Sequence, residues 1–255
     1  MKKFLFLSAL GLAISGSVAA QDYASLQGRT VDVQIISDTN GPLPIYSRYG
    51  KNYVPGAQGE RYSLYLHNNT PRRVLAVVSI DGVNVVSGQD ASLYQQGYVL
   101  GPGQTSKIDG WRKSNSQVAR FYFSSPSASY ANRTGRSENI GVIGVAVFNE
   151  ARPVPTPRPY ARAAQSAPAS DASAAAAETM SAPSLGTGHG EREYSYVNET
   201  YFQRANSPVE VLRIEYDTWR VLNDKGIIPR GQRLNQRDPF PVNQYVPDPP
   251  MGRMR

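Results

Sequence analysis

A glycine-rich segment near residue 190 places a histidine among acidic and basic neighbours. The segment GTGHGER covers 186–192, and Glu193 follows it, so His189 is close in sequence to Glu191 and Arg192. A histidine exposed by such a turn can move a proton or hold an anion, and paired carboxylates can do acid–base chemistry on sugars. Glycines also permit a tight backbone path without any chemistry. We interpret GTGHGER as the hinge where a low-complexity stretch rejoins the fold, with a catalytic or ligand-binding role for His189 as the alternative.

The sequence is poor in residue types that build catalytic or metal centres. Its 255 residues include two histidines, His67 and His189, and no cysteine. A multi-histidine metal site, a thiolate site, a cysteine nucleophile and disulfide bonds are therefore excluded. No G-x-S-x-G elbow is present, and no lysine followed by serine or threonine continues the glycine-rich segment as in a phosphate loop. We expect no cofactor, no metal and no catalytic constellation.

One further pattern resembles a metal-binding loop. Residues 38–41, Asp-Thr-Asn-Gly, begin like a calcium loop. The twelfth position would be Tyr49, whereas such a loop needs a bidentate glutamate there. We therefore predict a plain turn.

Two loops, GWRKS at 110–114 and SYANRTGR at 129–136, combine aromatic rings with cations. Stacking on a sugar or a peptide, together with ion pairing to an acidic group, needs these residue types. Loops also carry the binding sites of many β scaffolds. With the histidine of the glycine-rich segment, they supply the candidate partner-binding residues: Trp111, Arg112, Tyr130, Arg133, Arg136 and His189. The alternative is that the tryptophan packs inward and the arginines are solvated.

The first twenty residues have the three parts of a secretory signal peptide. Two lysines form a positive start, residues 4–14 are apolar, and residues 18–20 have small side chains before the expected cleavage ahead of Gln21. An apolar run of this length is too short for a hydrocarbon core, which needs about 20 residues. We expect a periplasmic or secreted protein with no integral membrane segment after signal cleavage.

The charge of the chain favours acidic partners. The formal net charge is +7 at pH 7, and an excess of this sign attracts acidic proteins and acidic glycans. An exported chain is a poor partner for nucleic acid, so we expect none. The alternative is that the positive charge only keeps the protein soluble.

Residues 21–150 are predicted to form the main part of a β domain. Residues 31–35 and 61–67 alternate apolar and polar side chains, as half-buried strands do. Residues 74–80 and 140–148 are apolar on both faces, which predicts strands inside a sheet. Further short strands are expected at 83–86, 97–100, 106–111 and 118–123. Strands at this spacing favour a sandwich or a barrel.

Glycine and proline predict the turns between these strands. Asp81-Gly82 indicates a tight turn, because both central positions of that turn favour positive φ. Residues 41–44, Gly-Pro-Leu-Pro, are predicted to be a second turn. Gly141 and Gly144 lie inside an apolar strand, where we expect them to make room for a bulky ring.

Residues 151–185 are dominated by alanine, serine and proline and have few large apolar side chains. Such a stretch cannot offset its own ordering entropy, so we predict a disordered insertion. The polar, proline-rich residues 230–255 are predicted to be a tail.

Structure is expected to resume over 186–229. Strands are predicted at 193–202 and 209–214, followed by a short helix capped by Asp217 and ended near Gly226. A segment of this size is too small to own a core. It should therefore complete the first part, giving an all-β, sandwich-like single domain with a short C-terminal helix and a long disordered insertion.

Four runs of the sequence are distinctive: SIDGVNVVSG, GYVLGPGQTSKIDGWRKS, SYANRTGRSENIGVIGVAVF and LGTGHGE. They resemble an uncharacterised family of exported proteobacterial β-rich proteins, and the resemblance covers most of the predicted domain. It implies the same two-part layout with a variable tether, and it transfers no activity, substrate or site residue.

Together these features predict a non-catalytic binding or assembly protein of the bacterial envelope. It would contact an acidic protein or glycan through the basic and aromatic loops. The alternatives are a carbohydrate-binding module and a glycan-acting hydrolase that uses carboxylates near His189.

Overall fold

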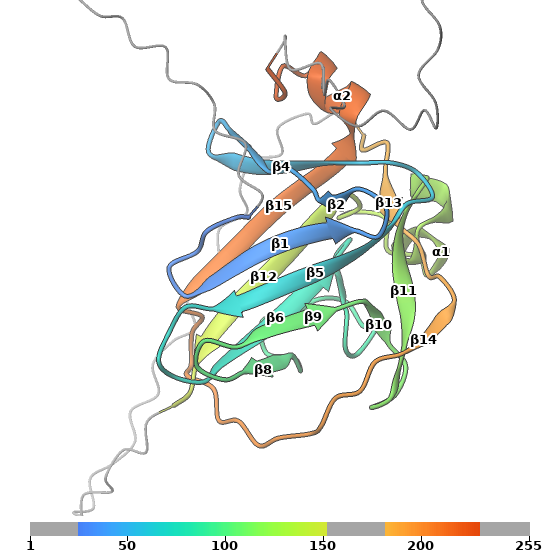
Figure 1. Ribbon diagram of the computed structural model, residues 1–255. Coiled ribbons are helices and arrows are strands. Elements are labelled where there is room, and N and C mark those ends of the chain that lie inside the picture. Colours follow the sequence, from blue (N-terminus) through green and yellow to red (C-terminus); the bar gives the residue numbers. More distant parts are fainter. Residues whose placement is uncertain (1–24, 152–181, 230–255) are drawn as a thin grey trace, which may run out of the picture.

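The computed structural model describes residues 25–151 and 182–229, which form a two-layer β-sandwich with two short α-helices (Figure 1). The predicted all-β, sandwich-like fold is confirmed. The predictions for the leader, for most of the insertion and for the tail lie outside the described residues. Within the described ranges, neither helix has the length and apolar sequence that crossing a bilayer requires.

The first layer is an eight-stranded sheet. Its strands are β1 (Val31–Ser37), β2 (Gly41–Pro42), β5 (Arg61–Asn68), β9 (Thr105–Ile108), β10 (Gly110–Arg112), β11 (Gln117–Ser124), β13 (Gly186–Thr187) and β14 (Arg192–Tyr194). The order is β10-β11-β5-β1-β2, with β13 and β14 paired to β11 and β9 paired to β5. Strand β11 is therefore where the two separated parts of the chain meet in this layer.

The second layer is a seven-stranded sheet. Its strands are β3 (Tyr46–Arg48), β4 (Lys51–Gly56), β6 (Val74–Ile80), β7 (Val83–Asn84), β8 (Tyr98–Leu100), β12 (Val142–Asn149) and β15 (Glu210–Thr218). The order is β3-β4-β15-β12-β6-β7, with β8 also paired to β6. The pair β15–β4 is parallel, and β15 also pairs antiparallel with β12. The C-terminal part of the chain thus contributes strands to both sheets.

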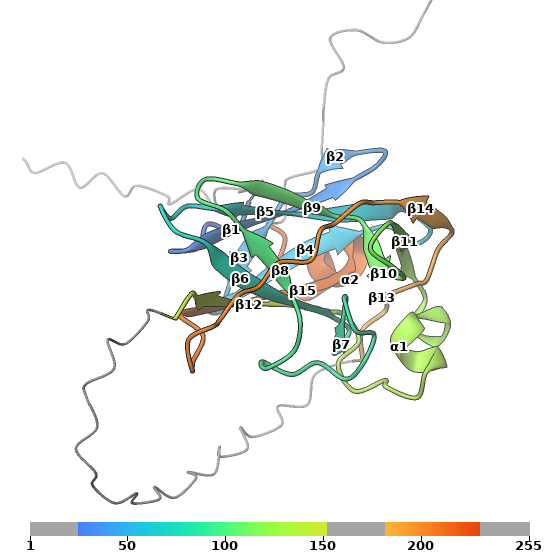
Figure 2. The ribbon, with the colours of Figure 1, turned by 90° about the horizontal axis from the view of Figure 1, so that it is seen from below.

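The core lies between the two layers. In Figure 2 the layer with β1, β5 and β9 lies above the layer with β6, β12 and β15. Every second side chain of β1 is buried, as its alternation predicts, whereas β6 buries six of its seven residues and lies inside its sheet. The aromatic centre of the core joins the layers, since the Phe123 ring contacts Tyr62 at 4.4 Å and Tyr216 at 5.4 Å.

Two short helices close the ends. Helix α1 (Tyr130–Arg133) follows a 3-10 turn (Pro126–Ala128), and helix α2 (Trp219–Asp224) follows β15. The sequence predicted Asp217 as the cap of α2, but Thr218 caps it, accepting a hydrogen bond from the Val221 amide at 3.3 Å. Asp217 is instead a buried residue of β15. Gly226 ends the helix with φ of 69°, as expected.

The turn predictions are confirmed in one place and wrong in another. Asp81 and Gly82 have φ of 53° and 75°, which confirms the tight turn. Gly41 and Pro42 are not a turn, because they form β2 and pair with the end of β1. The turn lies at 38–40, inside the segment 38–41 that the sequence predicts to be a plain turn.

The prediction that Gly141 and Gly144 make room for a ring is wrong. A Cβ at Gly144 would lie 2.8 Å from Ser79 Oγ, so that glycine fits against a serine. Gly141 has φ of 84°, which other residues rarely adopt. Rings lie instead over Gly56 and Gly188, where an added Cβ would come within 2.8 Å of Phe123 and 2.1 Å of Tyr122.

The strand predicted at 193–202 is also too long. Its ladder ends at Tyr194, because the next residues bond to a loop and not to a strand. The amides of Ser195 and Val197 donate to the carbonyls of Ser116 and Asn115, at 2.9 and 2.8 Å. We call residues 195–200 the strap.

Candidate functional site

The glycine-rich segment is fixed in the sheet and is not a hinge. Residues 185–188 are buried, and β13 pairs with the end of β11. The amides of Gly188 and Gly190 donate to the carbonyls of Tyr122 and Arg120, at 2.8 and 2.9 Å. We call residues 185–190 the anchor.

The glycines of the anchor are required by close packing. A Cβ at Gly186 would lie 2.6 Å from Ser129 Cβ and 3.0 Å from Ile140. A Cβ at Gly190 would lie 2.9 Å from the Arg120 carbonyl oxygen. The tight backbone path that the sequence suggested is therefore present, and each glycine has a steric reason.

A buried chain of hydroxyl groups holds the anchor between the layers. Thr187 Oγ1 lies 2.7 Å from both the Tyr62 and the Tyr216 hydroxyl oxygens, and Tyr216 donates to Asp81 Oδ1 at 2.5 Å. Because each hydroxyl has one proton, Tyr216 must accept from Thr187, which in turn accepts from Tyr62. The carboxylate of Asp81 also accepts from the amides of Thr187 and Gly141, at 2.7 and 2.9 Å.

Burial sets the protonation of this chain. It raises the pKa of Asp81 from 3.8 to about 6, although hydrogen bonds from Tyr216, Thr187 and Gly141 oppose the shift. Burial also raises the pKa of the Tyr62 and Tyr216 hydroxyls well above their usual value of 10, so both remain protonated. These hydrogen-bonded hydroxyl groups are enclosed in the core, where their role is to fix the anchor.

The anchor presents His189 against an aromatic stack. The His189 ring lies 5.5 Å from Tyr130, which lies 4.8 Å from Trp111. Tyr130 is positioned by α1, whose capping residue Ser129 accepts from the Asn132 amide at 3.1 Å. His189 is half-buried, and not exposed as the sequence suggested.

Trp111 lies beneath the stack and does not face solvent. It is 3% exposed, and its indole Nε1 donates to the Gly188 carbonyl at 3.0 Å. No external ring can reach it, which corrects its place among the predicted contact residues. Inward packing of this tryptophan is the alternative that the sequence left open, and the structure confirms it.

Three exposed cations act electrostatically on His189. Lys113, Arg133 and Arg192 are exposed, and with burial they lower the pKa of His189 below its usual value of 6.5, burial being the largest cause. None of the ion pairs among the described residues includes any of the three. We call Tyr130, His189 and these cations the His189 platform.

The other two predicted arginines have partners within the chain. Arg136 lies over the Tyr130 ring at 5.7 Å and donates to the Gly88 carbonyl at 2.8 Å, so it borders the platform. Arg112 turns the other way and donates to the Tyr98 hydroxyl and the Ser195 carbonyl. The structure thus brings together Tyr130, Arg133, Arg136 and His189, and it separates Arg112 from them.

The two glutamates near His189 are engaged by arginines. Glu191 pairs with Arg61 at 2.7 Å. Glu193 lies 3.2 Å from Nε of the buried Arg120, whose other nitrogens bind Asp38 and Asp109. No carboxylate is among the causes that shift the pKa of His189. Both glutamates thus lie against arginines, and no ion pair among the described residues joins either of them to His189.

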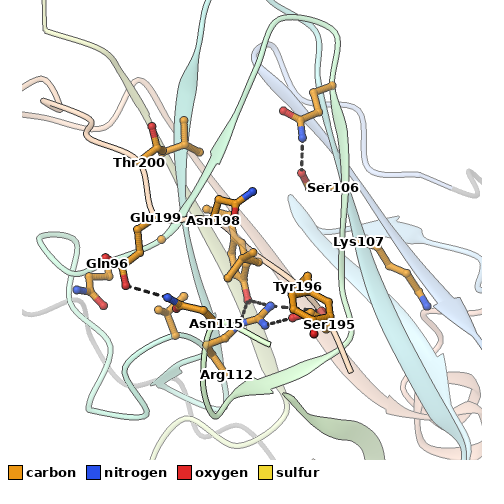
Figure 3. A pocket seen from close by; sticks show the side chains of 16 residues that line it. Gln96, Ser106, Lys107, Arg112, Asn115, Ser195, Tyr196, Asn198, Glu199 and Thr200 are labelled. Carbon is orange, nitrogen blue, oxygen red and sulfur yellow. Dashed lines mark hydrogen bonds between the residues drawn. The ribbon is translucent and has the colours of Figure 1, made fainter. Parts of the chain in front are cut away.

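A pocket of about 650 Å³ lies between the segment that runs from β8 to β9 and the strap (Figure 3). Arg112 and Asn115 form one wall, and Ser106 and Lys107 lie across the view from Gln96 and Glu199. Sequence reasoning missed this pocket, because its walls come from segments about a hundred residues apart.

Comparison with family models, curated proteins and solved structures gave no match. The resemblance to the exported proteobacterial family therefore stays a prediction. Function has to be argued from the geometry of this chain.

Chemistry at a metal centre was not expected from the sequence. Among the described residues, no group of three or more His, Cys, Asp or Glu side chains is arranged to hold a metal ion. The acidic side chains that lie close together are arranged around cations, as Asp38, Asp109 and Glu193 are around Arg120.

Proposed function

We propose that this protein is an exported, non-catalytic binding or assembly protein of the bacterial envelope. Its His189 platform receives an acidic group from an envelope protein or an acidic glycan. The observation that carries the proposal is the set of three exposed cations without ion-pair partners among the described residues, whose charges act on a half-buried histidine that packs against Tyr130.

The cluster of like charges is unfavourable in the free protein and becomes favourable when an anion binds. Like charges placed around one ring repel, and an incoming carboxylate or phosphate removes that cost. Arg133 and Arg192 can each meet such a group with two N–H donors. The Tyr130 ring supplies an apolar contact surface of the kind enriched at binding faces.

Export is proposed from the leader pattern at the N-terminus and from the resemblance to an exported family. Periplasmic or secreted localisation follows from the same two features. The net charge of +7 favours acidic partners.

The hydrolase alternative is less well supported by this geometry. A glycan-acting hydrolase needs one carboxylic acid to donate a proton and a second carboxylate at a set separation. Glu191 and Glu193 instead serve as partners of Arg61 and Arg120. Loss of wall-polysaccharide turnover in Glu191→Gln, with turnover present in the native protein, would favour the hydrolase.

The platform is tested by calorimetric titration with two acidic probes, an aspartate-rich peptide and a mannuronate hexasaccharide. Changing Lys113, Arg133 and Arg192 to alanine should weaken binding of the preferred probe about a hundredfold, since each ion pair contributes roughly 1 kcal/mol. Binding should also weaken as salt rises.

The control removes equal charge elsewhere. Arg72 is exposed on the β5–β6 turn, at the far end of the sandwich from α1 (Figure 1), and Arg213 and Arg220 have exposed side chains. Their triple alanine variant should bind like the native protein. An equal loss of affinity in both variants would mean that only net charge matters. Unchanged affinity in the platform variant would refute the proposal.

A further inference from the structure

The pocket beside the strap is separate from the His189 platform and has the dimensions of a ligand site. Its volume of about 650 Å³ falls within the roughly 300–1,000 Å³ of small-molecule sites. Its walls are the segment that runs from β8 to β9, the 112–115 loop and the strap (Figure 3).

The charges in the pocket are already matched within the chain. Arg112 directs its three nitrogens at the Tyr98 hydroxyl and at the carbonyls of Ser114 and Ser195. Lys107 pairs with Asp109 at 2.7 Å. Because both cations already have partners within the protein, the pocket offers an acidic ligand no unpaired positive charge.

The one carboxylate of the pocket reinforces this preference. Glu199 Oε1 accepts from Asn115 Nδ2 at 3.0 Å (Figure 3). A carboxylate repels an acidic ligand, but its oxygens can accept from the hydroxyl groups of a neutral one. The pocket and the platform therefore select ligands of opposite character.

The rest of the lining is polar and uncharged, with tyrosine rings. Gln96 and Asn198 have amides that donate and accept at once, and Ser106 and Thr200 add hydroxyls. Every hydroxyl group of a sugar can likewise both donate and accept a hydrogen bond. Tyr196 is 81% exposed, so its ring is available for stacking on the apolar face of a sugar.

A second ring is already oriented. Arg112 lies 5.7 Å from the centre of the Tyr98 ring and bonds its hydroxyl. This contact orients the ring in the lining of the pocket before any ligand arrives, which lowers the entropic cost of binding.

We infer that this pocket binds a neutral oligosaccharide, with Tyr196 as the stacking residue and Gln96, Asn198 and Glu199 as hydrogen-bonding partners. The site does not depend on the His189 platform. Its occupant is a chain of uncharged sugars, as found in cell-wall or extracellular polysaccharide.

Calorimetric titration with two neutral probes, cellohexaose and chitin hexasaccharide, tests the inference, with mannuronate hexasaccharide as the acidic comparison. We expect saturable binding of a neutral probe that salt does not weaken. Tyr196→Ala should weaken it about tenfold, the loss of one ring contact, and Asn198→Ala by a few-fold.

Tyr194→Ala is the matched control. Tyr194 is 73% exposed on β14, two residues from Tyr196, and it does not line the pocket. Its variant should bind as the native protein does, as should Arg133→Ala, which removes one cation of the platform and leaves the pocket intact. Binding of neither neutral probe at millimolar concentration, binding of the acidic probe alone, or unchanged affinity in Tyr196→Ala would each overturn the inference.

Discussion

The anchor at 185–190 and the strap at 195–200 lie on one stretch of chain, a few residues apart, and they are held in different ways. The anchor is bonded to β11, and its first four residues are buried. The strap keeps backbone bonds at Ser195 and Val197 and exposes most of its side chains. The anchor contains the buried Leu185 and packs against β11, whereas the backbone amides of the strap bond to the 115–116 loop. The anchor positions His189, and the strap leaves its side chains available for a ligand.

The strongest test of this contrast is a substitution that overpacks the anchor. In Gly186→Ala the new Cβ would meet Ser129 and Ile140, both buried. Overpacking of a rigid site costs about 3 kcal/mol, so we expect the free energy of unfolding to fall by that amount. Asn198→Ala in the strap should change it by less than about 0.5 kcal/mol. Urea denaturation measures both, and equal effects would show that the two parts are held alike.

The buried carboxylate gives the anchor a pH dependence. The folded pKa of Asp81 is about 6 and the ordinary value is 3.8, so the folded state binds the proton more tightly. Its contribution to stability is full below 3.8 and is lost as pH rises through about 6, a change of about 3 kcal/mol.

Asp81→Asn removes this titration and tolerates the positive φ. Relative to the variant, the native protein should lose stability as pH rises through that window, as measured by urea denaturation across it. Asp224→Asn, with a side chain 67% exposed, is the control and should track the native protein. A native protein that tracks Asp81→Asn at every pH would contradict the assignment.

A smaller effect is expected from one hydroxyl group. Thr187→Val keeps the shape but leaves the buried Tyr62 hydroxyl without its acceptor. The loss should destabilise the fold by about 2 kcal/mol. Thr200→Val makes the same change in the strap, where the side chain faces water and no buried group loses a partner. Thermal melts should show the same melting temperature for this variant and the native protein. Similar melting of the two variants would mean that the hydroxyl chain does not hold the anchor.

The sequence predicts the regular parts of this fold and names some residues of the two sites without showing how they are assembled. Alternation in β1 and β5, continuous apolarity in β6 and β12, and the Asp81-Gly82 turn are local patterns, and they are sufficient. The residues after Tyr194 continue a strand-like pattern, and only their bonding to the 115–116 loop makes them a strap.

The site residues show the same division between local patterns and tertiary contacts. Tyr130, Arg133 and His189 could be named as candidates from their types, but the inward position of Trp111 and the gathering of Lys113 and Arg192 depend on tertiary packing. The pocket has no local signature, because the strap that closes it lies about a hundred residues from the other walls.

The central claim is that the anchor holds His189 inside an anion-binding platform. The chain has two histidines, so the imidazole signals can be assigned by changing each one and followed by NMR as pH varies. We predict that the pKa of His189 lies below 6.5 in the free protein. It should rise when the acidic probe binds, because a bound anion favours the imidazolium, while the His67 signal does not respond to the probe. A His189 pKa that the probe leaves unchanged would contradict the account.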